Sequence, residues 1–492
     1  MTTTTAAPGT PTDSFRPGAI FVDGQFITSD GEPLPVTDKA TGEVIGTTAS
    51  ATIAEVDRAV AGAVAAQRDW HATPATERAA ILRRAGALLD AATPRFRDVL
   101  VREGGATGPK ALGEIGASVI EFYQAAELAT TPLGEVIPSG QRGRVNLVER
   151  VPVGVVGLIT AWNAPLHIAL RVLAPAIALG NAVALKPAPE TPFVGGLMIA
   201  EILAQAGLPA GVVQVLPGAE AGPALVNHPD VQMIHFTGSE PTGILINVAA
   251  APLLKRVALE LGGNNASIVL SDADLDLAAQ CGATSSFGHQ GQVCIATGRH
   301  IVLADVAEAY IARLVEHARA LTVGDPFVSD VDLGPMLSTR QADRALEMVS
   351  HSVEMGARVV EGGTADGVFL RPTVVTDVAP GMALHDEEVF APIAPITVVD
   401  TVEQALEIVN GTRFGLSTAV FGRDLDNAWA VADRVRSGMV HVNDGSAMHE
   451  SHVPFGGTAA SGLGDDLGGR ANIDLLTERR WTSLQRNTSP PR

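Results

Sequence analysis

Residues 151–190, VPVGVVGLITAWNAPLHIALRVLAPAIALGNAVALKPAPE, decide the fold. They begin with a continuous apolar run that ends at Asn163, continue with helical apolar spacing closed by Gly180, and return to a second apolar run that ends at Lys186. Continuous apolar strands that alternate with helices are typical of a parallel sheet covered on both faces. The stretch therefore predicts two neighbouring parallel strands joined by a crossover helix.

The same alternation extends along the chain on both sides of this stretch. Downstream, the patterns predict a helix over 192–207, strands over 211–218 and 231–239, and a helix over 241–251. Upstream, they predict short strands over 21–38 and 40–50 and two helices over 53–70 and 75–92, which Thr52 or Thr73 can cap. A second series from about residue 260 predicts helices over 272–290 and 306–321 and strands over 299–306, 368–378, 394–401, 418–422 and 438–444. We expect an α/β fold with two doubly wound parallel sheets, which suits a chain of 492 residues, too long for one core.

Two segments fit neither series. Residues 126–150 are typical of an inserted hairpin, and the C-terminal TERRWTSLQR alternates as an exposed strand does. Two unpaired strands favour sheet formation between copies of the chain, so we expect a homo-oligomer, either a dimer or a tetramer.

Composition excludes several classes of partner. The formal net charge of −20 and the isoelectric point near 5.0 argue against nucleic acids and anionic membrane surfaces. The most apolar stretch, 151–185, is interrupted by His167, Arg171 and Asn181, so no membrane span is predicted.

The N-terminal residues predict no targeting signal. MTTTTAAPGTPTDSF lacks a basic region and an apolar run, and we interpret residues 1–16 as a disordered tail. Cys281 and Cys294 are the only two cysteines, which suits reduced thiols in the cytoplasm, and neither they nor the histidines form a metal-ligand pattern.

Three side chains are candidates for chemistry. Cys294, in HQGQVCIATGR, is either an inert buried thiol or a nucleophile that small neighbours leave accessible. Glu260, in LELGGNN, ends an apolar strand, where burial raises a carboxyl pKa toward neutrality and suits a general base; it can equally pair with a neighbouring cation. Asn163 ends a strand at the sheet edge where ligands bind, and it can donate to an oxyanion or form a turn before Pro165.

Two further strand ends suit a nucleotide. Lys186 ends the second apolar strand, and FTGSEPTG places Gly238 and Ser239 between a strand and the start of a helix, where backbone N–H groups bind phosphate. The simpler interpretations are a surface lysine and a helix cap.

The order and spacing of these motifs are more specific than any one of them. Six segments occur in one chain in this order: AWNAPLHIALRVLAPAIALGNAVALKPAPETP, FTGSEPTG, LELGGNN, GQVC, EEVFAP and PFGGTAASGLG. From about residue 17 onward the chain resembles the aldehyde dehydrogenase superfamily. The resemblance implies two doubly wound α/β domains, one for the cofactor and one for catalysis, plus a small β oligomerisation arm. The implied limits are 17–125 and 147–259 for the NAD(P)-binding domain, 260–472 for the catalytic domain, and 126–146 and 473–492 for the arm.

The same resemblance implies a mechanism and a set of site residues. Cys294 attacks the aldehyde carbonyl, Asn163 and the Cys294 N–H stabilise the oxyanion, and Glu260 activates the water that hydrolyses the thioester. The implied NAD(P)-binding residues are Thr160, Trp162, Lys186, Pro189, Glu190, Gly238, Ser239, Gly262, Glu388 and Phe390.

The cofactor motif departs from the family pattern at one position. Many NAD-preferring relatives have KPAE, whereas this chain has KPAP, with the carboxylate displaced to Glu190. Loss of the carboxylate reduces repulsion of a 2′-phosphate and favours NADP, but Glu190 restores NAD preference if it turns inward. We expect NAD, with NADP as the alternative.

The substrate class follows from finer similarity. HQGQVCIATGRH, ELGGNNA and HVPFGG are similar to the bacterial benzaldehyde, vanillin and salicylaldehyde dehydrogenases, and Ala164 stands where many relatives have a bulky aromatic residue. We therefore expect an aromatic aldehyde; Arg171 favours the alternative of an acidic semialdehyde, and an aliphatic aldehyde is also open. The implied substrate-binding residues are Ala164, His167, Ile168, Arg171, Val293, Ile295, His449 and Phe455. A CoA-acylating dehydrogenase, which generally lacks the glutamate base, and a non-catalytic protein of this fold are less favoured.

Overall fold

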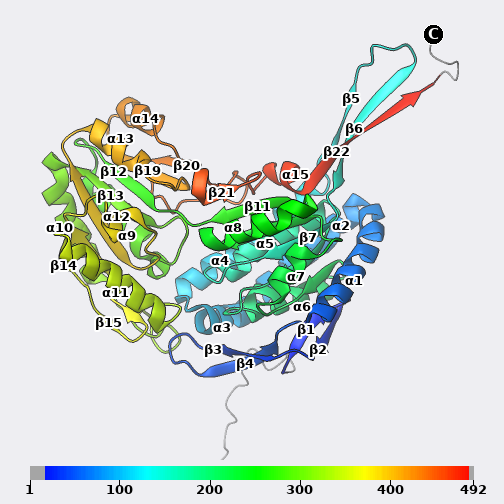
Figure 1. The fold of residues 1–492 in the computed structure, drawn as a ribbon, viewed down its shortest axis with the longest axis horizontal. Coiled ribbons are helices and arrows are strands. Elements are labelled where there is room, and N and C mark those ends of the chain that lie inside the picture. The colour runs from blue at the N-terminus through cyan, green and yellow to red at the C-terminus, as the bar shows by residue number, and fades with distance from the viewer. Residues whose placement is uncertain (1–16, 487–492) are drawn as a thin grey trace, which may run out of the picture.

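The computed structural model describes residues 17–486 of the chain. The predicted tail 1–16 and the last residues of the predicted arm, 487–492, lie outside the described residues. Within the described part, two large sheets with their helices form two lobes, and a narrow β arm projects from one of them (Figure 1). No helix of residues 17–486 has both the length and the apolar character needed to cross a membrane.

The first sheet has ten strands, and its centre is parallel. Strands β11, β10, β7, β8 and β9 run parallel to one another, whereas β1 pairs antiparallel with β9. The strands in spatial order are β21 (Gly462–Leu463), β11 (Arg256–Leu261), β10 (Met233–Gly238), β7 (Val155–Ile159), β8 (Ala182–Lys186), β9 (Val213–Val215), β1 (Ala19–Val22), β4 (Val44–Ala49) and β3 (Pro33–Thr37), with β2 (Gln25–Thr28) paired to β1.

Helices cover both faces of this sheet, as the buried strands require. All five residues of β7 and of β8 are buried, so both faces need an apolar cover. One face packs against α2 (Ala75–Ala91), α3 (Thr93–Gly104), α4 (Gly108–Leu128), α5 (Pro165–Ala178), the π-helical turn Phe193–Leu197 and α6 (Met198–Gln205). The other face packs against α1 (Ile53–Ala72), α7 (Ala221–Asn227) and α8 (Glu240–Ala250), which a short 3₁₀ turn, Ala251–Leu253, follows.

The second sheet has seven strands, of which only β14 runs antiparallel to its neighbour. Its order is β14 (Arg358–Glu361), β17 (Thr373–Thr376), β18 (Ile393–Val399), β13 (Thr297–Leu303), β12 (Asn265–Val269), β19 (Ser417–Phe421) and β20 (Met439–Val442). Its helices are α9 (Leu275–Phe287), α10 (Ala304–Ala320), α11 (Thr339–Glu354), α12 (Ala383–Asp386), α13 (Val402–Asn410) and α14 (Leu425–Ala432). The small hairpin β15 (Ala365–Asp366) and β16 (Phe369–Leu370) completes this lobe. The parallel order confirms the doubly wound α/β prediction.

The arm corrects one expectation. The predicted hairpin and the C-terminal strand do not stay unpaired: β6 (Arg144–Pro152) lies between β5 (Gly134–Ile137) and β22 (Thr477–Gln485) in an antiparallel three-stranded sheet. Helix α15 (Ala471–Leu476) leads into β22, and Figure 1 shows this C-terminal strand beside β5 and β6. Helix α4 extends to Leu128 and β6 extends to Pro152, so the hairpin is shifted from the predicted segment 126–146.

One of the two predicted helix caps is wrong. Thr52 forms a capping box with Glu55 at the start of α1, whereas Thr73 ends that helix and Pro74 precedes α2 without a side-chain cap. Pro74 occupies the N-cap position and its side chain carries no acceptor, so no side chain there binds the first N–H groups of α2.

Candidate active site

Cys294 follows a turn of unusual backbone geometry. After α9, residues His289, Gln290 and Gly291 all adopt the left-handed conformation, with φ of +50°, +56° and +65°. A Cβ atom on Gly291 would lie 2.1 Å from the carbonyl oxygen of Ala391, so only glycine fits there. Non-glycine residues in this conformation cost about 1–3 kcal/mol each, and such strain persists only where neighbours hold it.

Hydrogen bonds from three directions hold the loop. The side-chain amide of Gln290 donates to the carbonyl oxygens of Gly105 and Pro335 at 3.1 and 2.7 Å. On the other side of the turn, Asn265 Nδ2 donates to the carbonyl oxygen of Cys294 at 2.8 Å. The position of the thiol is therefore fixed by both lobes. No hydrogen bond joins the ring of His289 to Cys294 among the described residues.

Asn163 reaches the loop from the end of β7. Its Nδ2 donates to the carbonyl oxygen of Gln292 at 2.9 Å. A side-chain amide carries two donor hydrogens, so one is left for an oxyanion next to Cys294.

The backbone of Asn163 is held by an ion pair on α4. Lys110 Nζ donates to the carbonyl oxygen of Asn163 at 2.8 Å and contacts Glu114 at 2.5 Å. The other oxygen of Glu114 accepts from the backbone N–H groups of Leu166 and His167, in the first turn of α5. The N-cap residue of α5 is alanine, so Glu114 satisfies N–H groups that its own helix leaves open.

Glu260 lies on β11 at the same edge of the sheet. It is 8% exposed, and its Oε2 accepts no hydrogen bond in the described part of the chain. Burial raises the pKa of Glu260 to about 8, against the opposing charge of Arg171. A carboxyl group with this pKa changes protonation near neutral pH, as a general base requires.

The thiol of Cys294 is protonated in this environment. Burial, Glu388 and Glu260 raise the pKa of Cys294 to about 12, and Arg171 opposes the shift. The nucleophile is the thiolate, so the thiol must lose its proton before the sulfur attacks.

Two cavities meet at Cys294. The residues that line both are Asn163, Thr237, Glu260, Leu261 and Cys294. The cavity that we call the cofactor cavity is lined in addition by Ala161, Trp162, Gly238, Ser239, Gly262, Gln341, Arg344, Glu388 and Phe390. The cavity that we call the substrate cavity is lined in addition by Ala164, His167, Ile168, Arg171, Val172, Val293, Ile295, His449, Phe455 and Leu467.

The cofactor cavity contains six of the ten residues predicted to bind NAD(P). The side chain of Glu388 accepts from Gly263 N at 3.0 Å, and a Cβ on Gly262 would lie 2.2 Å from Glu388 Oε2. The rings of Phe390 and Trp162 pack edge to face, with 5.6 Å between their centroids. The other four predicted residues do not line this cavity; they lie at the ends of β7 and β8 and just beyond: Thr160, Lys186, Pro189 and Glu190.

The substrate cavity contains all eight residues predicted for it. Sequence reasoning missed several others in the two cavities: Ala161, Val172, Thr237, Leu261, Gln341, Arg344 and Leu467. Thr237 and Leu261 stand inside quoted motifs and could have been found there. Leu467 returns from the far end of the chain, and nothing in its local sequence indicates this position.

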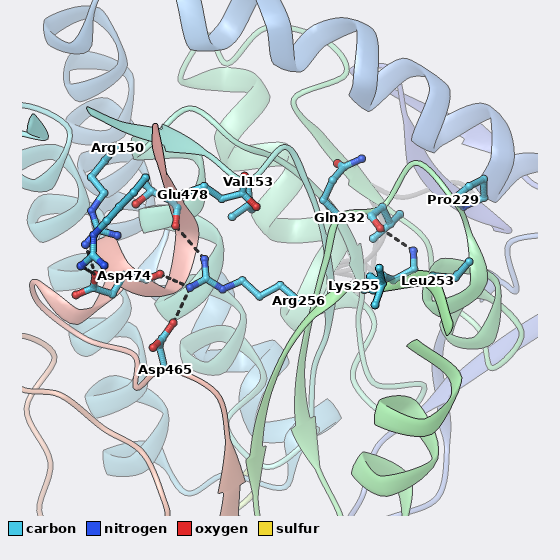
Figure 2. A pocket seen from close by; sticks show the side chains of 14 residues that line it. Arg150, Val153, Pro229, Gln232, Leu253, Lys255, Arg256, Asp465, Asp474 and Glu478 are labelled. Atoms are coloured by element: carbon cyan, nitrogen blue, oxygen red, sulfur yellow. Dashed lines mark hydrogen bonds and ion pairs between the residues drawn. The ribbon is translucent and has the colours of Figure 1, made fainter. Parts of the chain in front are cut away.

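A third, wider cavity lies apart from Cys294 at the base of the arm (Figure 2). It shares no lining residue with the other two among the described residues. Arg256 crosses it from β11 and donates to Asp465 at 2.7 Å and to the carbonyl oxygens of Asp474 and Thr477. These contacts tie the C-terminal segment to the first sheet. Among residues 17–486, no group of histidine, cysteine and acidic side chains could hold a metal ion.

Comparison with known proteins agrees with this arrangement. Residues 26–482 match the aldehyde dehydrogenase family. A benzaldehyde dehydrogenase [NAD(+)] of Pseudomonas putida is 46% identical over 468 residues, 95% of this chain and 96% of that protein. A vanillin dehydrogenase of an Amycolatopsis species is 42% identical over 470 residues, 95% of this chain and 96% of the relative. The crystal structure of a salicylaldehyde dehydrogenase from Pseudomonas putida G7, complexed with salicylaldehyde, superposes with a TM-score of 0.93 at 34% identity, covering 96% and 99% of the two chains. With the doubly wound lobes and a cysteine where two cavities meet, these matches show that the chain belongs to the aldehyde dehydrogenase family, whose members are NAD(P)-dependent oxidoreductases.

Proposed function

We propose that the protein oxidises an aromatic aldehyde to the carboxylic acid through a thioester on Cys294, with NAD(P) as oxidant. One observation carries the proposal: Asn163, Glu260 and Cys294 lie where the two cavities meet. A substrate from one side and a nicotinamide from the other therefore reach the same sulfur atom. The names of the similar benzaldehyde and vanillin dehydrogenases support an aromatic substrate.

The first half-reaction forms the thioester. The thiol proton of Cys294 passes to solvent water, and the thiolate sulfur adds to the aldehyde carbon. The resulting oxyanion accepts hydrogen bonds from the free amide hydrogen of Asn163 and from the backbone N–H of Cys294. Bound NAD(P) would supply the acceptor for the hydride that this carbon loses. Cys294 then carries the acyl group as a thioester.

The second half-reaction releases the acid. Glu260 takes a proton from water, the water oxygen attacks the thioester carbon, and the C–S bond breaks to return the thiolate. The unpartnered Oε2 of Glu260 is the atom available for this proton. A CoA-acylating reaction would need no such base.

The cofactor cavity fits a nicotinamide nucleotide. Gly262 leaves the space in which Glu388 sits on the cavity lining, and next to the lining residue Ala161 the buried Thr160 Oγ1 has no protein partner in the described residues. Glu388 would bind the ribose next to the nicotinamide, and Ser239 with the first turn of α8 would lie near the pyrophosphate. We assign cofactor binding to the lobe of the first sheet and the nucleophile to the lobe of the second.

We propose a preference for NAD over NADP. Burial lowers the pKa of Lys186, and the carboxylate of Glu190 opposes this shift, which places Glu190 near the lysine that would hold the adenosine ribose. A carboxylate there repels a 2′-phosphate. Kinetics of Glu190→Gln with each cofactor test this: the NADP to NAD ratio of kcat/KM should rise, and an unchanged ratio would contradict the assignment.

We propose that the chain self-associates and works in the cytoplasm. In the arm, Val136 and Trp481 are 71% and 67% exposed on strands with open edges, which suits contact with a second copy. Both cysteines are free thiols, which suits a reducing compartment.

A panel of aromatic, aliphatic and acidic aldehydes, assayed with NAD and with NADP, tests the proposed function. We expect the highest kcat/KM for aromatic aldehydes, a free acid as product, and no oxidation by Cys294→Ala. Cys281→Ala is the matched control and should remain active. Full activity of the Cys294 variant, or a preference for an aliphatic or acidic aldehyde, would contradict the proposal.

A further inference from the structure

The substrate cavity has a polar strip on one wall. His167 and Arg171 are four residues apart on α5, so they project from the same face of the helix, and both line the cavity. The rest of the lining is mostly apolar, with Ala164, Ile168 and Val293 among its residues. His167 is 7% exposed and Arg171 is 5% exposed.

The polar atoms of this strip have no partner in the described part of the chain. In the described residues, the two ring nitrogens of His167 make no hydrogen bond, and neither does the Nε of Arg171. Within residues 17–486, the only hydrogen bond of Arg171 goes to the carbonyl oxygen of Glu450, at 3.5 Å, and no ion pair joins Arg171 to a carboxylate. Buried polar groups in proteins are nearly always hydrogen-bonded, so three open atoms on a cavity wall point to a bound group.

The donors and acceptors of the strip match a hydroxyl group. Burial, Arg171 and His449 lower the pKa of His167 to about 3, so the ring is neutral and offers one donor and one acceptor nitrogen. The Nε–H of Arg171 only donates. A hydroxyl group can donate to the imidazole and accept from the guanidinium at the same time.

An anionic group fits less well. In their ionised forms Glu121 and Glu260 already favour the charged form of Arg171, because they raise its pKa against the effect of burial. A substrate carboxylate would add a third negative group and would face the acceptor nitrogen of His167.

Aromatic side chains lie beside the strip. The guanidinium of Arg171 stacks over the ring of Phe455 at 4.7 Å, and His449 lies 5.7 Å from His167 and 6.5 Å from Phe455. These planar groups and the small Ala164 line the same cavity, which suits a flat ring.

We propose that the cavity selects a ring-hydroxylated aromatic aldehyde, whose hydroxyl group hydrogen-bonds to His167 and Arg171 while its carbonyl group meets Cys294. The proposal rests on the proposed oxidation of aromatic aldehydes and narrows it to substrates with a neutral hydrogen-bonding substituent.

The test compares kcat/KM for benzaldehyde, its meta and para hydroxy derivatives, and formylbenzoate. We expect the wild-type protein to prefer one hydroxybenzaldehyde over benzaldehyde by about tenfold or more, because a site built to hydrogen-bond a hydroxyl group rejects an analogue without it. His167→Leu removes both nitrogens and should reduce this ratio to about one.

The matched control is His235→Leu. His235 is also fully buried with both ring nitrogens unpartnered, but it lies on β10 and does not line the cavity. The hydroxyl preference should persist in this variant. A loss of equal size in both variants would overturn the proposal.

A second measurement needs no variant. Hydroxyacetophenone and acetophenone are ketones that cannot be oxidised, and the hydroxylated one should inhibit the wild-type protein about tenfold more strongly. Equal inhibition, or the highest kcat/KM for formylbenzoate or benzaldehyde, would overturn the hydroxyl assignment while leaving oxidation of aromatic aldehydes intact. Failure to oxidise any aromatic aldehyde would overturn both.

Discussion

Three side chains from distant parts of the sequence carry the chemistry at the scale of single residues. Asn163 follows β7, Glu260 lies near the end of β11, and Cys294 lies just before β13. Each of the three stands in a recognisable motif. The local sequence alone favours an inert thiol at Cys294. Its loop geometry favours the reactive interpretation, because three consecutive left-handed residues are maintained just before it.

The protonation of Glu260 predicts the pH dependence of hydrolysis. A general base acts in its ionised form, so with a pKa of about 8 the rate of thioester hydrolysis should rise as pH increases through 8 and level off above it. Stopped-flow measurement of the steady-state rate after the first turnover checks this. In Glu260→Gln the rise should vanish; a rate that falls with pH would contradict the role of the carboxylate as base.

The amide of Asn163 predicts a loss in acylation rate. Asn163→Ala removes a donor to the oxyanion and should lower the rate of the first hydride transfer about 10²–10³-fold, as loss of one oxyanion donor does elsewhere. Alkylation of Cys294 by iodoacetamide, which forms no oxyanion, serves as the control and should change little. Equal losses in the hydride-transfer rate and in the alkylation rate would indicate that the substitution displaces the structure around Cys294.

At the scale of elements, α4 positions the start of α5. The carboxylate of Glu114 closes the first turn of α5, and its partner Lys110 holds the backbone of Asn163. Sequence reasoning assigned no element to residues 93–125, so it missed this pair. Neither residue belongs to a recognisable motif, and their role arises only when two helices pack.

Loss of this cap should affect stability and catalysis together. Glu114→Ala leaves two N–H groups and a half-buried lysine unpaired, and it should cost about 2–4 kcal/mol of unfolding free energy. Urea denaturation measures this cost, with the exposed Glu347→Ala as control. The acylation rate should fall as well, because Asn163 loses its support. An unchanged acylation rate would show that the cap stabilises the helix without positioning Asn163.

The fold was predictable to different degrees in different elements. The fully buried strands β7 and β8 have unbroken apolar sequences and were recognised directly. The pairing of β22 with β6 could not be predicted, because it joins residues more than 300 positions apart and alternating strands carry no mark of their partner. The eight predicted residues of the substrate cavity were found because family motifs place them, whereas Leu467 comes from an irregular segment without a pattern.

At the scale of the whole molecule, the arm is a projecting sheet with apolar side chains that a single chain leaves exposed. Its three strands project from the lobe of the first sheet with Val136 and Trp481 exposed (Figure 1). Val136→Lys should therefore shift the molecular mass measured by analytical ultracentrifugation from a multiple of 50.8 kDa toward 50.8 kDa. The exposed Val44→Lys is the control; a wild-type protein that is monomeric at micromolar concentration would contradict self-association.

The covalent intermediate is the most direct test of the whole account. Glu260→Gln protein is mixed with NAD and a hydroxybenzaldehyde, quenched with acid and digested, and the peptides are analysed by mass spectrometry. We predict an acyl group on the peptide that contains Cys294, together with about one reduced nicotinamide per chain, and neither in the double variant with Cys294→Ala. Oxidation of the aldehyde without an acyl adduct, or an adduct on Cys281, would contradict the account.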